Sequence, residues 1–75
     1  MTKPMTPKEI GEKIRQRRKL LQMTQADLAR LAACSRPSIL AAEAGKPSLR
    51  LDLLLAILHV LGLTLLVADA PPFED

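Results

Sequence analysis

Side chains of the kinds that usually perform catalysis are sparse in this chain of 75 residues. There is one cysteine, Cys34, and one histidine, His59, and neither belongs to a Ser/His/Asp or Cys/His set. The sequence also lacks paired inward carboxylates and a glycine-rich phosphate loop. A single cysteine can form neither a disulfide within the chain nor a multi-cysteine zinc site. We therefore expect no enzyme, and no metal, cofactor or small-molecule substrate.

The lone cysteine and histidine each allow two interpretations. Cys34 could sense oxidants, but the chain holds no second cysteine to resolve it, which favours a small buried apolar role. His59 could report pH or bind a metal, but it stands alone among leucines, which favours a surface or interface position.

Charge is unevenly distributed along the sequence. Residues 1–36 carry nine Lys or Arg against three Asp or Glu, whereas residues 37–75 carry two against five. This asymmetry predicts a face that binds polyanions and a separate packing face, although a merely solvated basic helix would give the same pattern. The single aromatic residue, Phe73, argues against modules that stack unpaired bases on aromatic side chains.

Capping patterns predict three helices that would position the basic residues. Thr6-Pro7-Lys8-Glu9 starts a helix to about Gln22, and Thr24 with Asp27 starts one to about Ala32. Ser35 is a good N-cap for a third helix, over about 36–44, that ends before Gly45. Because the last two helices are separated by only two or three residues, residues 24–44 predict a helix-turn-helix. The expected inward apolar residues are Ile10, Ile14, Leu21, Leu28 and Leu31, with Ala29 and Ala32.

The second half of the chain predicts a fourth helix and a strand. A helix from about Leu51 to Leu61, closed by Gly62, would be apolar over most of its circumference and would need a partner subunit to cover it. Residues 63–69 are typical of a strand, which we expect to pair with its own copy across a twofold axis. The predicted dimer interface comprises Leu54, Leu58, Leu61, Leu63, Leu65 and Val67.

These elements make residues 6–62 one domain, flanked by a flexible arm over 1–5 and an acidic tail over 70–75. The uncharged run 53–68 has about 16 residues, fewer than the roughly 20 that a membrane span needs. No cationic leader opens the sequence, so we expect a cytoplasmic protein that does not associate with a membrane.

Three segments carry a family resemblance: QADLA at 25–29, CSRPSI at 34–39 and EAGK at 43–46. Together with IRQRR at 14–18, they resemble the Xre/lambda-repressor helix-turn-helix family over about residues 10–62. The resemblance implies an all-α, four-helix, lambda-repressor-like DNA-binding domain. With a C-terminal β-strand that pairs across a homodimer, the layout is similar to HipB-type antitoxins, which are dimeric repressors that bind a kinase-like toxin.

The resemblance and the physics of helix ends together predict site roles. The third helix would lie in the major groove, with Ser35, Arg36 and Ser38 at base edges and Leu40 and Ala41 at thymine methyls. Arg36 is the side chain there that can contact guanine through two hydrogen bonds. The expected phosphate contacts are Gln25, which the family implies, and Lys46, Arg15 and Lys19.

Two further residues and one turn have roles that the family implies. Arg18 is expected to form a buried ion pair with Glu43, with phosphate binding as the alternative for Arg18. Helix geometry agrees, because it puts Glu43 on the same inward side as Ile39. The family usually has Gly where Ala33 stands, so a positive φ there would cost about 1 kcal/mol.

The predicted function is sequence-specific repression by a homodimer that binds a palindromic operator in double-stranded DNA. We expect this repressor to regulate its own gene and to be the antitoxin of a toxin–antitoxin pair. The alternative is a protein-interaction module that neutralises a kinase-like toxin, with DNA binding secondary. The outward side of the third helix keeps this alternative open. Its residues Pro37, Leu40, Ala41 and Ala44 donate no side-chain hydrogen bonds and could contact protein instead of DNA.

Overall fold

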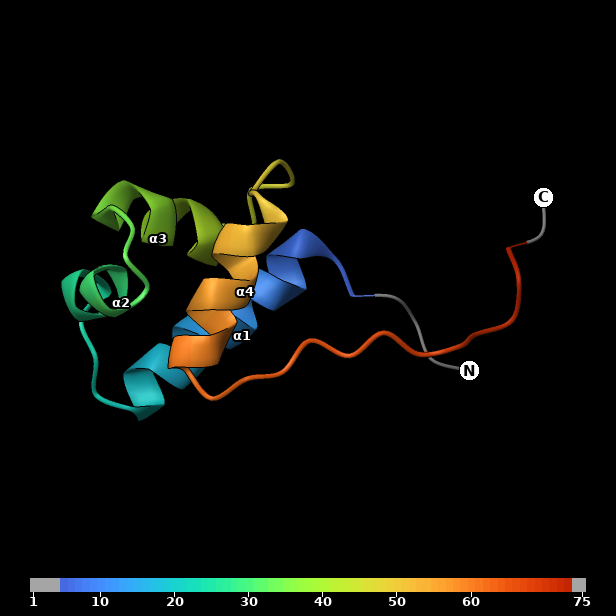
Figure 1. The fold of residues 1–75 in the computed structure, drawn as a ribbon, viewed down its shortest axis with the longest axis horizontal. Coiled ribbons are helices and arrows are strands. Elements are labelled where there is room, and N and C mark those ends of the chain that lie inside the picture. Colours follow the sequence, from blue (N-terminus) through green and yellow to red (C-terminus); the bar gives the residue numbers. More distant parts are fainter. Residues whose placement is uncertain (1–4, 74–75) are drawn as a thin grey trace.

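The computed structural model describes residues 5–73 and folds them into four α-helices. These are α1 (Pro7–Leu20), α2 (Gln25–Leu31), α3 (Arg36–Glu43) and α4 (Leu51–Val60). Helix α3 packs against α1 and α2, and α2 also packs against α4 (Figure 1). The predicted N-terminal arm, apart from Met5, and the last two residues of the predicted acidic tail lie outside the described residues.

Three helices begin at the predicted caps. The Thr6 hydroxyl accepts a hydrogen bond from the Glu9 backbone N–H at 3.1 Å, and the Glu9 carboxylate accepts one from the Thr6 N–H at 3.3 Å. Thr24 and Asp27 form the same reciprocal pair at the start of α2, at 3.0 Å each way. Such capping boxes satisfy backbone donors that the helix itself leaves free.

All four helices end in one motif, in which the chain turns into the left-handed region directly after the C-cap. The residues with positive φ are Gln22 (57°), Ala33 (55°), Gly45 (78°) and Gly62 (70°). At each end two backbone N–H groups return to the last turn, as in the bonds Gln22 N–H to the Lys19 carbonyl and Met23 N–H to the Arg18 carbonyl. The first helix therefore ends at Leu20, two residues earlier than predicted.

The core draws a fully buried side chain from every helix. Ile14 of α1, Leu28 of α2, Ile39 of α3 and Ile57 of α4 are 0% exposed, and Leu61 joins them just after α4. Each such burial stabilises the fold by about 1.5–3 kcal/mol. These contacts anchor the inner face of α3 to the core and leave its outer face at the surface of the bundle.

Two predicted inward leucines are in fact exposed. Leu21 is 43% exposed and Leu31 is 52% exposed. Leu21 follows the early end of α1, so the helical spacing no longer applies to it. At Leu31 the inward positions of the short helix α2 are already occupied by Leu28, Ala29 and Ala32.

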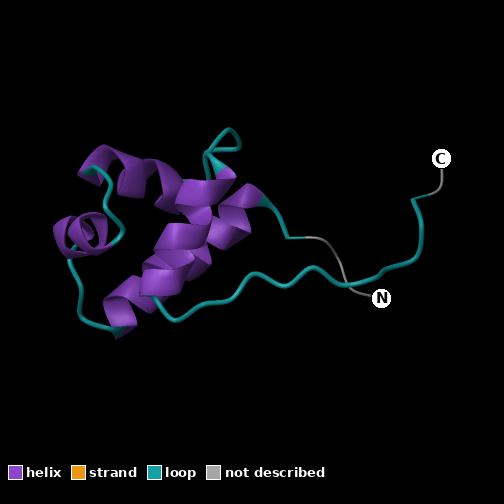
Figure 2. Ribbon diagram, viewed as in Figure 1, coloured by secondary structure: helices purple, strands orange, loops and turns teal. Residues whose placement is uncertain are grey.

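The predicted strand over 63–69 is absent from the described chain (Figure 2), which corrects that expectation for a single chain. Residues 63–73 instead form an extended tail that leaves the end of α4 and runs away from the helices (Figure 1). Ladder hydrogen bonds need a neighbouring strand, and the described residues supply none. Only Leu63 of this tail packs against the core.

Candidate nucleic-acid interface

Polar groups gather at the N-terminal end of α3. The Ser35 hydroxyl caps the helix by accepting from the Ser38 backbone N–H at 3.3 Å, and the two serine hydroxyls lie 3.0 Å apart. Arg36 and Pro37 follow the cap and are exposed. Because Ile39 and Ala42 face the core, the opposite side of α3 is open to a ligand.

The outward side of α3 continues the surface with apolar groups. Leu40 is 47% exposed, Ala44 is exposed and Ala41 is half-buried. Leu40 and Ala41, which were predicted to contact thymine methyls, thus add apolar surface but no hydrogen-bond donor to this side of the helix.

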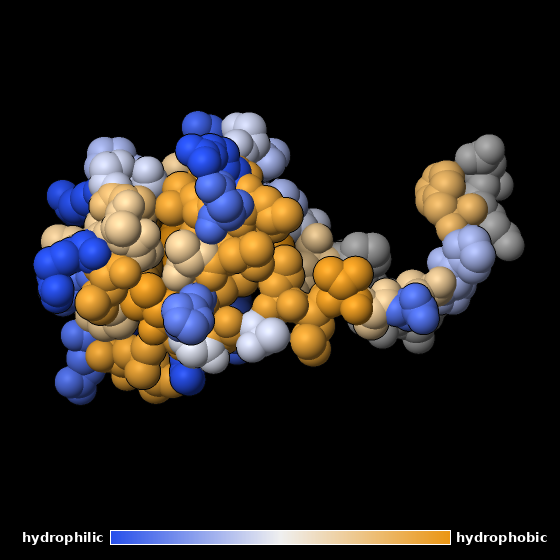
Figure 3. Space-filling view, viewed as in Figure 1, coloured by the Kyte–Doolittle hydropathy of each residue, from blue (hydrophilic) through white to orange (hydrophobic). Residues whose placement is uncertain are grey.

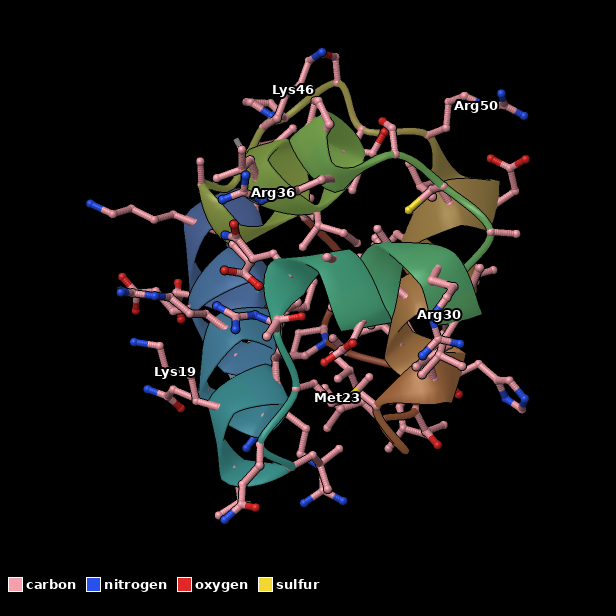
Figure 4. The ribbon with its side chains drawn as sticks, turned by 90° about the vertical axis from the view of Figure 1, so that its left-hand side faces the viewer. Lys19, Met23, Arg30, Arg36, Lys46 and Arg50 are labelled. Carbon is pink, nitrogen blue, oxygen red and sulfur yellow. The ribbon has the colours of Figure 1, made fainter. Side chains whose placement is uncertain are left out.

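Arg36 is joined to the start of α2 through Gln25. Arg36 donates from Nε to the Gln25 Oε1 at 3.3 Å, and Gln25 donates from Nε2 to the Glu43 Oε1 at 3.3 Å. Figure 4 shows Arg36 at the end of α2 where this helix begins. The exposed Arg36 of α3 is thus held against the half-buried Gln25 at the start of α2.

Arg18 and Glu43 form the ion pair that the family implied. Arg18 Nε lies 2.6 Å from Glu43 Oε2, and an Arg18 terminal nitrogen lies 3.1 Å from Oε1. Their side chains are only 10% and 6% exposed, and Arg18 also donates to the Met23 carbonyl at 2.9 Å. This buried position excludes Arg18 from direct phosphate contact and ties α1 to α3 and to the turn before α2.

The other predicted phosphate contacts are exposed. Lys46 lies in the loop after α3, and Arg15 and Lys19 lie on α1. In Figure 4, Lys19 lies beside α1, with Arg36 and Lys46 higher in the same view, whereas Arg30 lies at the other end of α2. The hydrogen-bonded group of Arg18, Glu43, Gln25 and Arg36 contains none of these three residues.

A family model described as helix-turn-helix matches residues 14–67, which is most of the chain. The chain belongs to the helix-turn-helix family, of the Xre/lambda-repressor type. Members of this family are DNA-binding transcription regulators, a class that is generally not enzymatic. No curated protein matches the chain.

The prediction missed Arg50, a cationic residue of this helix-turn-helix domain. Arg50 precedes α4 and lines a groove between α3 and α4 with Ser38, Lys46 and Ser48. Arg50 also bonds Asp52 through two nitrogens, at 3.1 and 2.6 Å, and this hydrogen bonding lowers the pKa of the Asp52 carboxyl. The signal that could have revealed Arg50 is its position directly before a helix that starts without a side-chain cap.

Arg17 was also missed, in a structural role. It donates from Nε to the Leu61 carbonyl at 2.9 Å, so it satisfies a free carbonyl at the end of α4. This contact joins α1 to α4 across 44 positions of sequence, which local patterns do not reveal.

Neither Cys34 nor His59 joins a reactive cluster of the helix-turn-helix domain. Cys34 is half-buried, and burial raises the pKa of its thiol, which disfavours the reactive thiolate. His59 is exposed on α4. Among residues 5–73, no group of three or more His, Cys, Asp or Glu side chains could hold a metal ion. None of the described helices is long and apolar enough to cross a membrane.

The residues predicted for the dimer interface divide into three groups. Leu58 and Leu61 are 6% and 0% exposed within the single chain, because they belong to its own core. Leu54 and Leu63 are partly buried against that core. Leu65 and Val67, in the tail, are 40% and 97% exposed. A second copy could therefore reach the tail far more readily than the buried side of α4.

Proposed function

We propose that this protein is a sequence-specific DNA-binding repressor that acts as a homodimer on a palindromic operator. The observation that carries this proposal is the set of polar side chains at the exposed N-terminal end of α3, where Arg36 stands beside Ser35 and Ser38. In a helix-turn-helix the N-terminal residues of the second helix contact base edges in the major groove.

Each group in this set has a distinct task. Arg36 reads guanine, a contact that contributes about 1–3 kcal/mol of discrimination against other bases. Ser35 and Ser38 bond to base edges, and Leu40 and Ala41 contact thymine methyls. Gln25, Lys46, Arg15 and Lys19 contact phosphates and so fix the orientation of the domain on the duplex. With so few hydrogen-bonding side chains, recognition also depends on DNA shape.

The proposed dimer is supported by apolar surface that the single chain leaves uncovered. On α4, Leu51 and Leu55 are 61% and 45% exposed, and in the tail Leu66 and Val67 are 82% and 97% exposed. Figure 3 shows apolar surface over the helical body and along the start of the tail. In the dimer two tails pair as an antiparallel ribbon, which places two α3 helices on half-sites about one helical turn apart, or a multiple of it.

A second candidate function is that of an antitoxin that neutralises a kinase-like toxin protein. The observation that favours it is the exposed apolar side of α3, where Leu40 is 47% exposed beside Pro37 and Ala44. Repression and neutralisation are compatible in one protein. Co-expression with the product of the adjacent gene, followed by purification of the pair, distinguishes an antitoxin from a plain repressor.

The test of the main proposal is a footprint on DNA upstream of the protein's own gene, with the salt concentration varied. We expect protection of a twofold-symmetric site, with about 10³-fold or greater preference over random DNA. The variant Arg36→Ala should lose about 1–3 kcal/mol of operator binding and keep its binding to random DNA. Uniform, salt-sensitive binding to all sequences, or an equal loss by Arg36→Ala on both DNAs, would contradict the proposal.

A further inference from the structure

Four side chains form a continuous chain of hydrogen bonds from the protein interior to the surface of α3. Arg18 donates to Glu43 at 2.6 and 3.1 Å, Gln25 donates to Glu43 at 3.3 Å, and Arg36 donates to Gln25 at 3.3 Å. Glu43 is 6% exposed at its side chain, whereas Arg36 is exposed. A buried carboxylate is thus two hydrogen bonds away from the residue that reads bases.

The chemistry of the neighbours fixes the orientation of the Gln25 amide. The Glu43 carboxylate only accepts hydrogen bonds, so the Gln25 atom that faces it must be the NH₂ group. The Arg36 guanidinium only donates, so the Gln25 atom that faces it must be the oxygen. A rotated amide would lose both bonds, and Glu43 therefore selects the amide orientation that holds Arg36.

We propose that Glu43 is a positioning residue for DNA reading, an inference that rests on the repressor function proposed above. Through Gln25 it holds the Nε side of the Arg36 guanidinium, which leaves the two terminal nitrogens as the remaining pair of donors. Arg36 then meets guanine end-on, through these two nitrogens, at O6 and N7. Glu43 itself touches neither base nor phosphate in this arrangement.

The experiment measures the specificity at one base pair separately from the overall affinity for DNA. An operator is first selected from random DNA by the full chain, and the base pair read by Arg36 is found as the one that Arg36→Ala no longer discriminates. Binding is then measured on the four operators that differ only there. The readout is the affinity ratio between the preferred base and the others, together with the affinity for random DNA.

The variant Gln25→Ala should lower both affinity and this ratio, the ratio by about 2- to 10-fold, because it loses a neutral hydrogen bond that orients Arg36. The matched control is Lys46→Ala, which removes a proposed phosphate contact without touching Arg36. It should weaken binding to all sequences alike and leave the ratio unchanged. In the Arg36→Ala background, Gln25→Ala should have no further effect on the ratio.

Glu43 is tested with Arg18→Met/Glu43→Met, because apolar replacement of a whole buried ion pair is often tolerated. We expect this double variant to lower the ratio by about 2- to 5-fold. The control Ile14→Val weakens the core without touching the hydrogen bonds and should keep the ratio of the wild type.

Three results would overturn the proposal, and each is distinguishable from failure of the repressor function. The first is a Gln25→Ala ratio equal to that of Lys46→Ala. The second is a folded Arg18→Met/Glu43→Met variant with the wild-type ratio, and the third is a base other than guanine at the pair that Arg36 reads. A wild-type chain that selects no sequence would instead overturn the repressor function, and this inference with it.

Discussion

At the scale of single residues, the turn between α2 and α3 holds a strained position. Ala33 has a φ of 55°, a conformation that costs an L-residue about 1–2 kcal/mol. The family resemblance had already indicated a position where Gly is usual. Because Ala33 is exposed, removal of its Cβ leaves no cavity.

We therefore expect Ala33→Gly to stabilise the domain by about 0.5–1 kcal/mol, after the extra entropy of glycine in the unfolded chain is subtracted. Thermal unfolding followed by circular dichroism should show a midpoint higher by a few degrees. The matched control is Ala26→Gly, an exposed position inside α2 that should lose about 1 kcal/mol. A lower midpoint for Ala33→Gly would refute the strain argument.

The site residues illustrate what the sequence alone could predict. The Arg18–Glu43 pair was predicted because a family pattern and the helical spacing of Glu43 and Ile39 agree. The bond between Gln25 and Arg36 was not, since it depends on side-chain directions across two helices. Arg17 and Arg50 were missed for the same reason: one meets a distant carbonyl and the other gains its place from the loop before α4.

At the scale of helices, starts were predicted more accurately than ends. A start is marked by side chains that cap the backbone locally, as Thr6, Thr24 and Ser35 do. The end of α1 carries no such signal, because Gln22 adopts the left-handed conformation that glycine usually signals. The ends of α3 and α4, marked by Gly45 and Gly62, were predicted to within one residue.

The crossing of α1 over α3 depends on a small residue. An added Cβ at Gly11 would lie 2.5 Å from the Ala42 carbonyl oxygen and 2.7 Å from that of Glu43. Ala normally stabilises a helix interior by about 1 kcal/mol over Gly, but here the backbone of α3 would have to move. We expect Gly11→Ala to lower the free energy of unfolding by about 2 kcal/mol.

Urea denaturation measures this effect, with Glu12→Ala as the control at the exposed neighbouring position. The control should change stability by no more than about 0.5 kcal/mol. A stabilising Gly11→Ala would mean that α1 and α3 lie farther apart than described.

A carboxyl group at the start of α2 makes the stability of the domain depend on pH in a predictable direction. The pKa of the Asp27 carboxyl is lowered, chiefly by the hydrogen bond from the Thr24 backbone N–H and then by the Thr24 hydroxyl. A lowered pKa in the fold means that the charged form stabilises it at pH values above the ordinary carboxyl pKa. That contribution is lost as the pH falls through the lowered pKa.

We therefore expect the unfolding midpoints of wild type and Asp27→Asn to differ most near neutral pH and to converge in acid, below about pH 4. Thermal melts at a series of pH values measure this. Asp69→Asn, in the tail outside the helices, is the control and should follow the wild-type curve. A constant difference between wild type and Asp27→Asn would exclude the capping carboxylate as its cause.

At the scale of the whole molecule, the helical body buries its core side chains within one chain, whereas the tail leaves apolar side chains exposed. Leu58 and Leu61 complete the core of their own chain, so α4 is covered on its inner side without a partner. The sequence predicted a helix that is apolar over most of its circumference, but it did not reveal that Leu58 and Leu61 are buried in the core of their own chain, because patterns within one chain do not show which side of a helix its neighbours occupy. The tail, in contrast, has exposed Leu66 and Val67 and forms no strand within the described chain.

We place the proposed dimer contact in the tail, where these apolar side chains are exposed. Proline at position 67 removes a backbone N–H, and no ladder hydrogen bond can form from it. In sedimentation experiments at micromolar concentration we expect the wild type to be dimeric and Val67→Pro to be mostly monomeric, with helix content unchanged. Phe73→Ser is the control, since Phe73 is 91% exposed but lies beyond Pro71 and Pro72, outside the predicted strand.

Operator binding should fall with dimerisation in Val67→Pro because two half-sites are then bound independently. A wild-type chain that sediments as a folded monomer would remove the reason for a palindromic operator, while the contacts of a single α3 would stand.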